Sequence, residues 1–149
     1  MIERTFSMIK PDSVLRGLAG EIISRIERKG LKIVGLKMIA VSEEQASRLY
    51  AVHKEKPFYK ELVSFIRSAP VIVIAIEGES AVSVMRRLIG STDSKEAAPG
   101  TVRGDFSCSK SMNLIHASDS VENAQNELSI FFTEAELMKY ERLDAKWVC

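Results

Sequence analysis

The segment NLIHASDS, residues 113–120, places a histidine among hydroxyl and carboxylate side chains. His116 is one of two histidines in the chain; Ser118 follows it closely, and Glu127 lies further along. A nucleophilic imidazole needs a ring nitrogen with a free lone pair and a partner that fixes the ring. A histidine at the end of a strand is more often structural, but these neighbours could supply that partner. His116 is therefore a candidate nucleophile.

Metal binding is the competing chemistry for this histidine. The other histidine, His53, is far away in the sequence, and Cys108 and Cys149 do not have the spacing of zinc ligands. The sequence thus disfavours a dedicated metal site. The two cysteines are most simply unpaired thiols.

Three basic side chains could bind phosphate oxygens. Lys10 ends a predicted strand, Arg86 lies late on a predicted helix, and Arg103 lies in a long segment without periodicity. Guanidinium groups suit phosphate because they donate in pairs and stay charged. From charge alone, three ordinary surface cations are the simpler interpretation, and only a fold that brings these residues together would favour a phosphate site.

Strands are expected at four places that could position these residues. Residues 3–9 precede a proline that ends a strand, and residues 34–40 alternate between apolar and other side chains. The run VIVIAI at 71–76 is apolar on both faces, which is typical of a central strand. Residues 114–115 predict a short last strand that ends at His116.

Helices are expected between these strands. Ile22, Ile23 and Ile26 share one face of a helix that begins near residue 18 and stops at Gly30. Residues 91–111 show no period, and an irregular stretch of this length is usually functional. The other expected helix starts are two capping boxes, two serine caps and a proline: Ser42 with Gln45, Thr133 with Glu136, Ser80, Ser120 and Pro57.

This order of elements predicts an α+β fold, with helices layered on a largely antiparallel sheet, in a single domain over residues 1–149. The net charge of +1 disfavours a general nucleic-acid or membrane-surface binder. No run of about 18 apolar residues is present, so no membrane span is expected. Without a signal-peptide core near the N-terminus, a cytoplasmic location is the expectation.

Five segments, in this order, resemble one known family. They are RTFSMIKPD at the start, KPFY at 56–59, RRLIGST at 86–92, PGTVRGDF at 99–106 and NLIHASDS at 113–120. Together they are similar to the nucleoside diphosphate kinases over essentially the whole chain. The resemblance implies a ferredoxin-like α/β sandwich with added helices and a long loop. It also implies a homo-oligomer, usually a hexamer (a tetramer is possible), with residues 97–100 in trimer contacts.

The resemblance implies ping-pong transfer of a γ-phosphate from a nucleoside triphosphate, usually ATP, to a nucleoside diphosphate through a phosphohistidine at His116. Ser118 and Glu127 would orient His116, and Phe58 and Leu62 would contact the base. Mg²⁺ would arrive on the nucleotide phosphates without direct protein ligands. The side chains implied around the phosphates and the ribose are Lys10, Tyr50, His53, Arg86, Thr92, Arg103 and Asn113.

Three positions depart from the common pattern of that family. Ala117 stands where many members have glycine, so the backbone there should not need a glycine-only conformation. Asp93 and Ser94 replace a pair that usually ends in proline, and Lys110 replaces a residue that is often apolar and touches the base. Nucleobase preference could therefore differ.

Two other functions compete with an active kinase. An inactive relative with a regulatory or scaffold role would have lost the nucleophile or the phosphate ligands, and this chain retains both. A nucleic-acid-binding α/β module would more often carry an aromatic-rich strand and a basic excess, which are absent from this sequence. Neither a specific nucleic acid nor a membrane is therefore expected as a partner.

Overall fold

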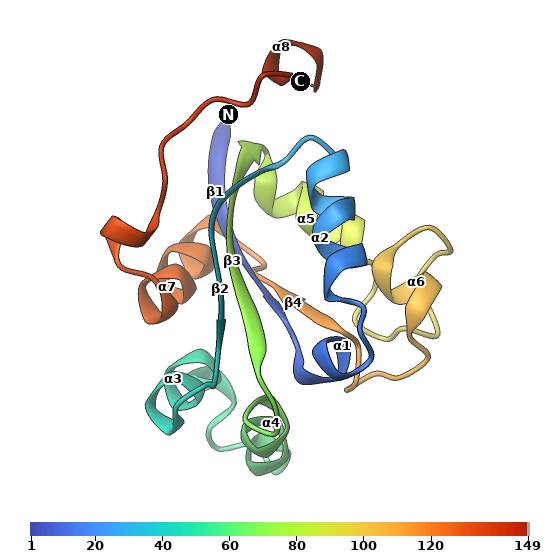
Figure 1. Ribbon diagram of the computed structural model, residues 1–149. Coiled ribbons are helices and arrows are strands. Elements are labelled where there is room, and N and C mark those ends of the chain that lie inside the picture. The colour runs from blue at the N-terminus through green and yellow to red at the C-terminus, as the bar shows by residue number, and fades with distance from the viewer. Residues whose placement is uncertain (149) are drawn as a thin grey trace.

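The N-terminal strand lies inside a four-stranded antiparallel sheet in the computed structural model, which describes residues 1–148 (Figure 1). The strand order is β2-β3-β1-β4. The strands are β1 (Ile2–Ile9), β2 (Lys32–Ile39), β3 (Val71–Glu79) and β4 (Ile115–Ala117). The run VIVIAI forms the buried part of β3, between β1 and β2, so the prediction of a central strand is confirmed. The predicted α+β class with an antiparallel sheet and added helices is confirmed as well, because this strand order is ferredoxin-like.

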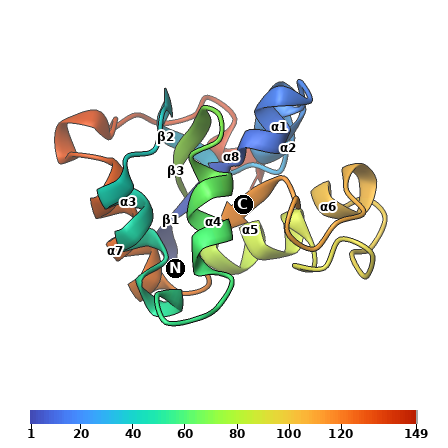
Figure 2. The ribbon, with the colours of Figure 1, turned by 90° about the horizontal axis from the view of Figure 1, so that it is seen from below.

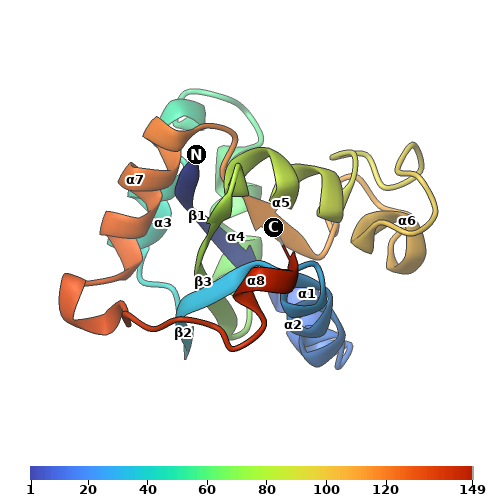
Figure 3. The same ribbon diagram turned by 90° about the horizontal axis from the view of Figure 1, so that it is seen from above.

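Helices cover both faces of the sheet (Figures 2 and 3). One face of β3 packs Val73 and Ala75 under α3 and α7, whereas Ile74 and Ile76 face α2 and α5. This division follows from the strand's period of two. The α-helices are α1 (Pro11–Leu15), α2 (Ala19–Arg28), α3 (Glu43–Leu49), α4 (Tyr59–Ile66), α5 (Ala81–Ile89), α6 (Val102–Phe106), α7 (Val121–Phe131) and α8 (Ala145–Val148).

Most predicted helix boundaries are confirmed. Ser42 and Gln45 form the capping box of α3, and the Ser120 side chain accepts a hydrogen bond from the Asn123 backbone N–H at the start of α7. Gly30, just beyond α2, has a φ of +102°, which glycine adopts without strain. The Thr133 capping box is also present, although it begins a 3-10 turn rather than an α-helix.

Ser80 was predicted as the cap of α5, and that prediction is wrong. Its backbone is left-handed, with φ +51°, and its side chain makes no capping hydrogen bond. A capping side chain needs an extended backbone to reach over the first turn. Glu3 of β1 replaces it, because its carboxylate accepts from the Val82 backbone N–H at 3.1 Å.

The segment expected to be irregular, residues 91–111, contains α6. Thr101 caps this short helix, its Oγ1 accepting from the Gly104 backbone N–H at 3.0 Å. The segment projects from the sheet beyond α5 (Figure 3). Leu114, expected in the last strand, lies outside it in a left-handed conformation with φ +79°, and β4 instead includes His116.

Pro11 was expected to end the first strand, and it does so by starting α1. Its fixed φ and missing N–H suit the first position of a helix. This short helix places Lys10 at the junction between β1 and α1. Cys108 is an exposed free thiol, and Cys149 lies outside the described residues. Within residues 1–148, no helix is long and apolar enough to cross a membrane.

Candidate active site

His116 lies on the short edge strand β4, opposite Met8 of β1. Its ring is partly exposed and 6.0 Å from the Phe6 ring, on the face of the sheet that α7 covers. Glu127 of α7 reaches back to the strand, with its Oε1 2.6 Å from His116 Nε2 and 2.7 Å from Ser118 Oγ. The structure therefore brings together three residues that the sequence placed up to one helix apart.

The acceptor at Nε2 determines what the imidazole can do. An ionised carboxylate only accepts hydrogen bonds, so Nε2 carries the proton and Nδ1 of a neutral ring keeps its lone pair. Ser118, which is fully buried, donates to the same oxygen and holds the carboxylate in place. Within residues 1–148, no hydrogen bond occupies Nδ1. The geometry thus gives His116 a fixed ring with one nitrogen available as a nucleophile.

Lys10 and Asn113 meet just beyond the end of the β1–β4 strand pair that carries His116. The Lys10 ammonium donates to Asn113 Oδ1 at 2.7 Å, although the two residues are 103 positions apart. The Asn113 amide in turn donates to the backbone oxygens of Thr92 and Lys110. Burial, and secondly the charge of Arg103, lower the pKa of Lys10 to about 8. A partly buried ammonium whose hydration is reduced gains from an incoming anion.

Arg103 is almost fully buried, which is unusual for this residue type. Its guanidinium donates to three backbone oxygens, those of Gly90, Asn113 and Ile115. Since a guanidinium has five N–H donors, each terminal nitrogen retains one. Burial, followed by the nearby charge of Arg86, lowers the pKa of Arg103 to about 10, which leaves it cationic at neutral pH. Arg103 therefore both ties the loop to β4 and contributes positive charge.

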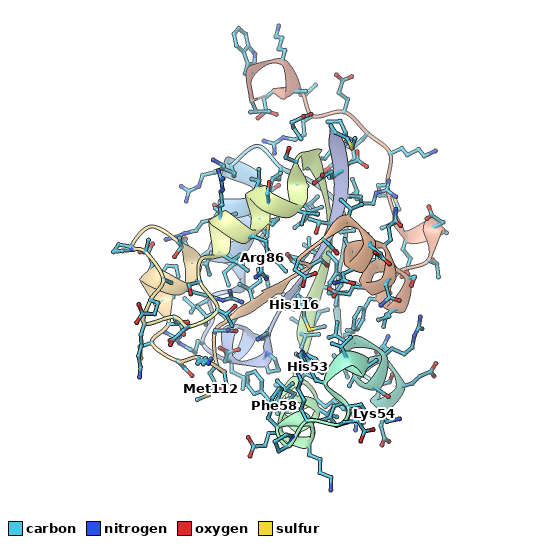
Figure 4. All side chains as sticks on the ribbon, turned by 180° about the vertical axis from the view of Figure 1, so that it is seen from behind. His53, Lys54, Phe58, Arg86, Met112 and His116 are labelled. Atoms are coloured by element: carbon cyan, nitrogen blue, oxygen red, sulfur yellow. The ribbon has the colours of Figure 1, made fainter. Side chains whose placement is uncertain are left out.

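Arg86 reaches the same strand from α5. Its side chain is exposed, and it donates to the Ala117 backbone oxygen at 3.1 Å, next to His116 in the chain (Figure 4). Thr92 is also exposed, and its backbone oxygen is the acceptor for Asn113. Lys10, Arg86 and Arg103 thus all contact residues 113–117, which answers the objection that they could be scattered surface cations.

A second group lies around the turn between α3 and α4. The His53 ring is 6.4 Å from the Tyr50 ring and 5.5 Å from the Phe58 ring. Phe58 is 43% exposed, with the Lys56 ammonium 5.7 Å from the centroid of its ring, and Leu62 packs one helical turn further along. Burial, and secondly the charge of Glu127, raise the pKa of Tyr50 to about 12, so its phenol stays protonated. That electrostatic coupling links the second group to the His116 network.

The three departures from the common family pattern fit into the loop and strand. Ala117 is a regular residue of β4, and only Ser80 and Leu114 have left-handed backbones among the described non-glycine residues. Ser94 is buried, and its hydroxyl makes no hydrogen bond within residues 1–148. Lys110 is exposed. Within the same residues, no cluster of three His, Cys, Asp or Glu side chains is placed to hold a metal.

Comparison with known proteins agrees with this geometry. A family model described as nucleoside diphosphate kinase matches residues 3–137. The nucleoside diphosphate kinase of Sulfurisphaera tokodaii is 60% identical over 92% of this chain and 93% of its own, and that of Archaeoglobus fulgidus is 50% identical over 99% and 97%. The structure of the Halobacterium salinarum enzyme in complex with CDP is 46% identical, with a TM-score of 0.96 over 100% of this chain and 99% of that one.

The family match, the sequence identity and the fold all lead to one assignment, and the hydrogen-bond network around His116 agrees with it. This chain belongs to the nucleoside diphosphate kinase family.

Proposed function

We propose that this protein carries a γ-phosphate from a nucleoside triphosphate to a nucleoside diphosphate on Nδ1 of His116. One observation carries the proposal: Glu127 holds Nε2 of a fixed imidazole while Lys10, Arg86 and Arg103 all contact the segment that contains it. In phosphoryl transfer the protein mainly positions the reacting groups and stabilises charge, and these residues provide both effects.

Each half-reaction forms one bond to phosphorus and breaks another. The Nδ1 lone pair attacks the γ-phosphorus, the bond to the bridging oxygen breaks, and the nucleoside diphosphate leaves with those electrons. A terminal oxygen of the second nucleoside diphosphate then attacks the phosphorus of the phosphohistidine, the bond from Nδ1 to phosphorus breaks, and its electrons return to Nδ1. Throughout, the Nε2 proton stays on the hydrogen bond to Glu127, which stabilises the positive charge that grows on the ring.

The phosphates would be held by side chains of different exposure. Arg86 and Thr92 are exposed and suit the outer phosphates, whereas Lys10, Arg103 and Asn113 are more deeply placed and suit the transferred group. Tyr50 would complete the site around the transferred group and the ribose, and His53 would lie beside the phosphates. Mg²⁺ would arrive on the nucleotide, where it neutralises phosphate charge, since this donor set is cationic and amide rather than carboxylate.

The base would stack on Phe58, with Leu62 beside it. The exposed ring offers a flat face, and every nucleobase has a matching π-face, so this contact tolerates different bases. The crystallised relative from Halobacterium salinarum holds CDP, which supports a nucleotide site in this chain too. Nucleoside di- and triphosphates are therefore the proposed partners.

A phosphoryl-exchange assay tests the proposed function. Purified protein with ATP, Mg²⁺ and each of several nucleoside diphosphates should form the matching triphosphates, and initial rates should give the parallel lines of ping-pong kinetics. Chelation of Mg²⁺ should suppress the exchange. Intersecting lines, or no exchange with any diphosphate, would contradict transfer through a covalent intermediate.

The ammonium of Lys10 makes the reaction pH-dependent. Because its pKa in the free protein is lowered to about 8, kcat/KM for ATP should fall as the pH rises through that value. The Lys10→Gln variant should have a lower kcat/KM that lacks this alkaline limb. Persistence of the limb in the variant would assign it to another group.

Stability should follow the same titration with the opposite sign. The folded protein binds Lys10's proton less tightly than the unfolded chain, whose ordinary pKa is 10.5. Between about pH 8 and that value the unfolded state binds more protons, so the contribution of Lys10 to the free energy of unfolding rises with pH. Urea titrations of the native protein and Lys10→Gln across this window measure that difference.

We also propose that the chain assembles with copies of itself, as a hexamer or a tetramer. β2 is an edge strand of eight residues, with Leu36 and Met38 exposed on it. An open apolar edge is a liability unless another chain covers it. Sedimentation equilibrium should report an oligomer, and Met38→Lys should shift it towards smaller species. A native protein that sediments as a monomer at every concentration would refute this assembly.

A further inference from the structure

Leu114 joins two parts of the active site through an uncommon backbone conformation. It is fully buried and left-handed, and it lies between Asn113 and the strand that carries His116. A left-handed backbone is unfavourable for leucine and persists only where the surroundings impose it. Something must therefore hold the Leu114 peptide groups in place.

The turn between β1 and α1 holds them on both sides. The Leu114 backbone oxygen accepts from the Lys10 backbone N–H at 2.9 Å and from Ser13 Oγ at 2.6 Å. The Leu114 backbone N–H donates to Asp12 Oδ2 at 3.1 Å. Ser13 is fully buried, and its hydroxyl bond is the shortest of the three.

These bonds close a loop around the Lys10–Asn113 pair. Lys10 contacts Leu114 through its backbone and the neighbouring Asn113 through its ammonium. If the backbone at Leu114 rotated, the side-chain amide of Asn113 would move relative to the Lys10 ammonium. Ser13, in the same turn as Lys10, restrains this rotation because its hydroxyl donates to the Leu114 backbone oxygen.

We propose that Ser13 is a positioning residue for phosphoryl transfer. It fixes the Asn113–Lys10 pair by holding the backbone oxygen of Leu114, whose left-handed conformation is strained. This role rests on the proposed function of His116. Ser13 does not contact Asn113 or His116 by any hydrogen bond within residues 1–148, so its effect passes through Leu114. Small errors in position at a reacting centre are costly in rate, which makes a single buried hydroxyl detectable.

The test compares Ser13→Ala with a matched serine variant. Ser7 of β1 is also fully buried, but its hydroxyl has no partner within residues 1–148, so Ser7→Ala removes a buried hydroxyl without removing a hydrogen bond. For each variant, rapid-quench mixing with γ-labelled ATP measures the rate of phosphohistidine formation, and thermal unfolding measures stability. Ser13→Ala should slow phosphorylation by about tenfold, whereas Ser7→Ala should stay within about twofold of the native rate.

A double-mutant cycle separates positioning from a general loss of stability. If Ser13 acts through the Asn113 amide, then Ser13→Ala in an Asn113→Ala background should slow phosphohistidine formation by less than about twofold, because the group that Ser13 positions is gone. A purely structural serine would impose the same factor in both backgrounds. Ser13→Cys, which keeps the size with a weaker donor, should give an intermediate rate and serves if Ser13→Ala does not fold.

The outcomes are distinct. A native protein that forms no phosphohistidine would overturn the proposed function itself. A native protein that is phosphorylated, with Ser13→Ala or Ser13→Cys equally fast or with fully multiplicative losses in the cycle, would overturn only the role of Ser13.

Discussion

The His116→Ala variant is expected to lose phosphoryl transfer by more than about a thousandfold while remaining folded, because no other group can take over the covalent step. The fold should persist, since His116 is on an edge strand and Glu127 keeps its hydrogen bond from Ser118. The exchange assay measures the rate, and circular dichroism with thermal unfolding measures the fold.

The other histidine provides the matched control. His53 lies between Tyr50 and Phe58, where it is proposed to assist nucleotide binding. His53→Ala should therefore raise KM modestly and still form the phosphohistidine. If His116→Ala kept substantial activity, or if His53→Ala lost the covalent intermediate, the nucleophile would have been assigned to the wrong residue.

The Gly104→Ala variant is expected to lower both stability and turnover, with the rate falling by about a hundredfold or more. A Cβ at position 104 would lie 2.0 Å from the Ala98 backbone oxygen, so α6 would have to move. The adjacent Arg103 ties the Gly90, Asn113 and Ile115 backbone oxygens together. Displacement of α6 would therefore disturb the loop and the active-site strand together.

Gly20 of α2 offers the control for this substitution. A Cβ there would meet no atom within 4 Å, and alanine favours a helix over glycine. Gly20→Ala should therefore raise the free energy of unfolding by up to about 1 kcal/mol and leave turnover unchanged. Urea titrations and the exchange assay compare the pair. If the Gly104→Ala protein were as stable and active as the native one, the loop would have accommodated the Cβ without disturbing the hydrogen bonds of Arg103.

Much of the fold could be predicted because local signals and tertiary packing agree. The VIVIAI run has no polar face, so only a strand covered on both sides accommodates it. Ser42 with Gln45 and Ser120 with the Asn123 N–H satisfy backbone donors within a single helical turn. Such bonds depend only on nearby residues, and the sequence specifies them directly.

The errors occur where a distant group decides the local structure. α5 is capped by Glu3 from another element, so no pattern near Ser80 could reveal it. Leucine is an ordinary residue in a strand, but the turn at residues 10–13 imposes a left-handed backbone on Leu114. In α6, the Thr101 cap was a readable local signal, although the helix is too short to show a period.

The candidate site divides in the same way. The sequence offered His116 and its near neighbours as chemistry, and Glu127 follows at a distance that one helix can span. It could not show that Lys10 meets Asn113, because 103 positions separate them, and only the family resemblance joined them in advance. Ser13 was missed because a lone serine two residues after a proline carries no signal until its acceptor is known.

The most direct measurement is the position of the phosphate after a single turnover. Incubation of the protein with γ-labelled ATP should give an adduct that is labile in acid and stable in base, and mapping under alkaline conditions should place the phosphate on His116 Nδ1, with no adduct in His116→Ala. Label that survives acid, or that appears equally in His116→Ala, would contradict transfer through this histidine.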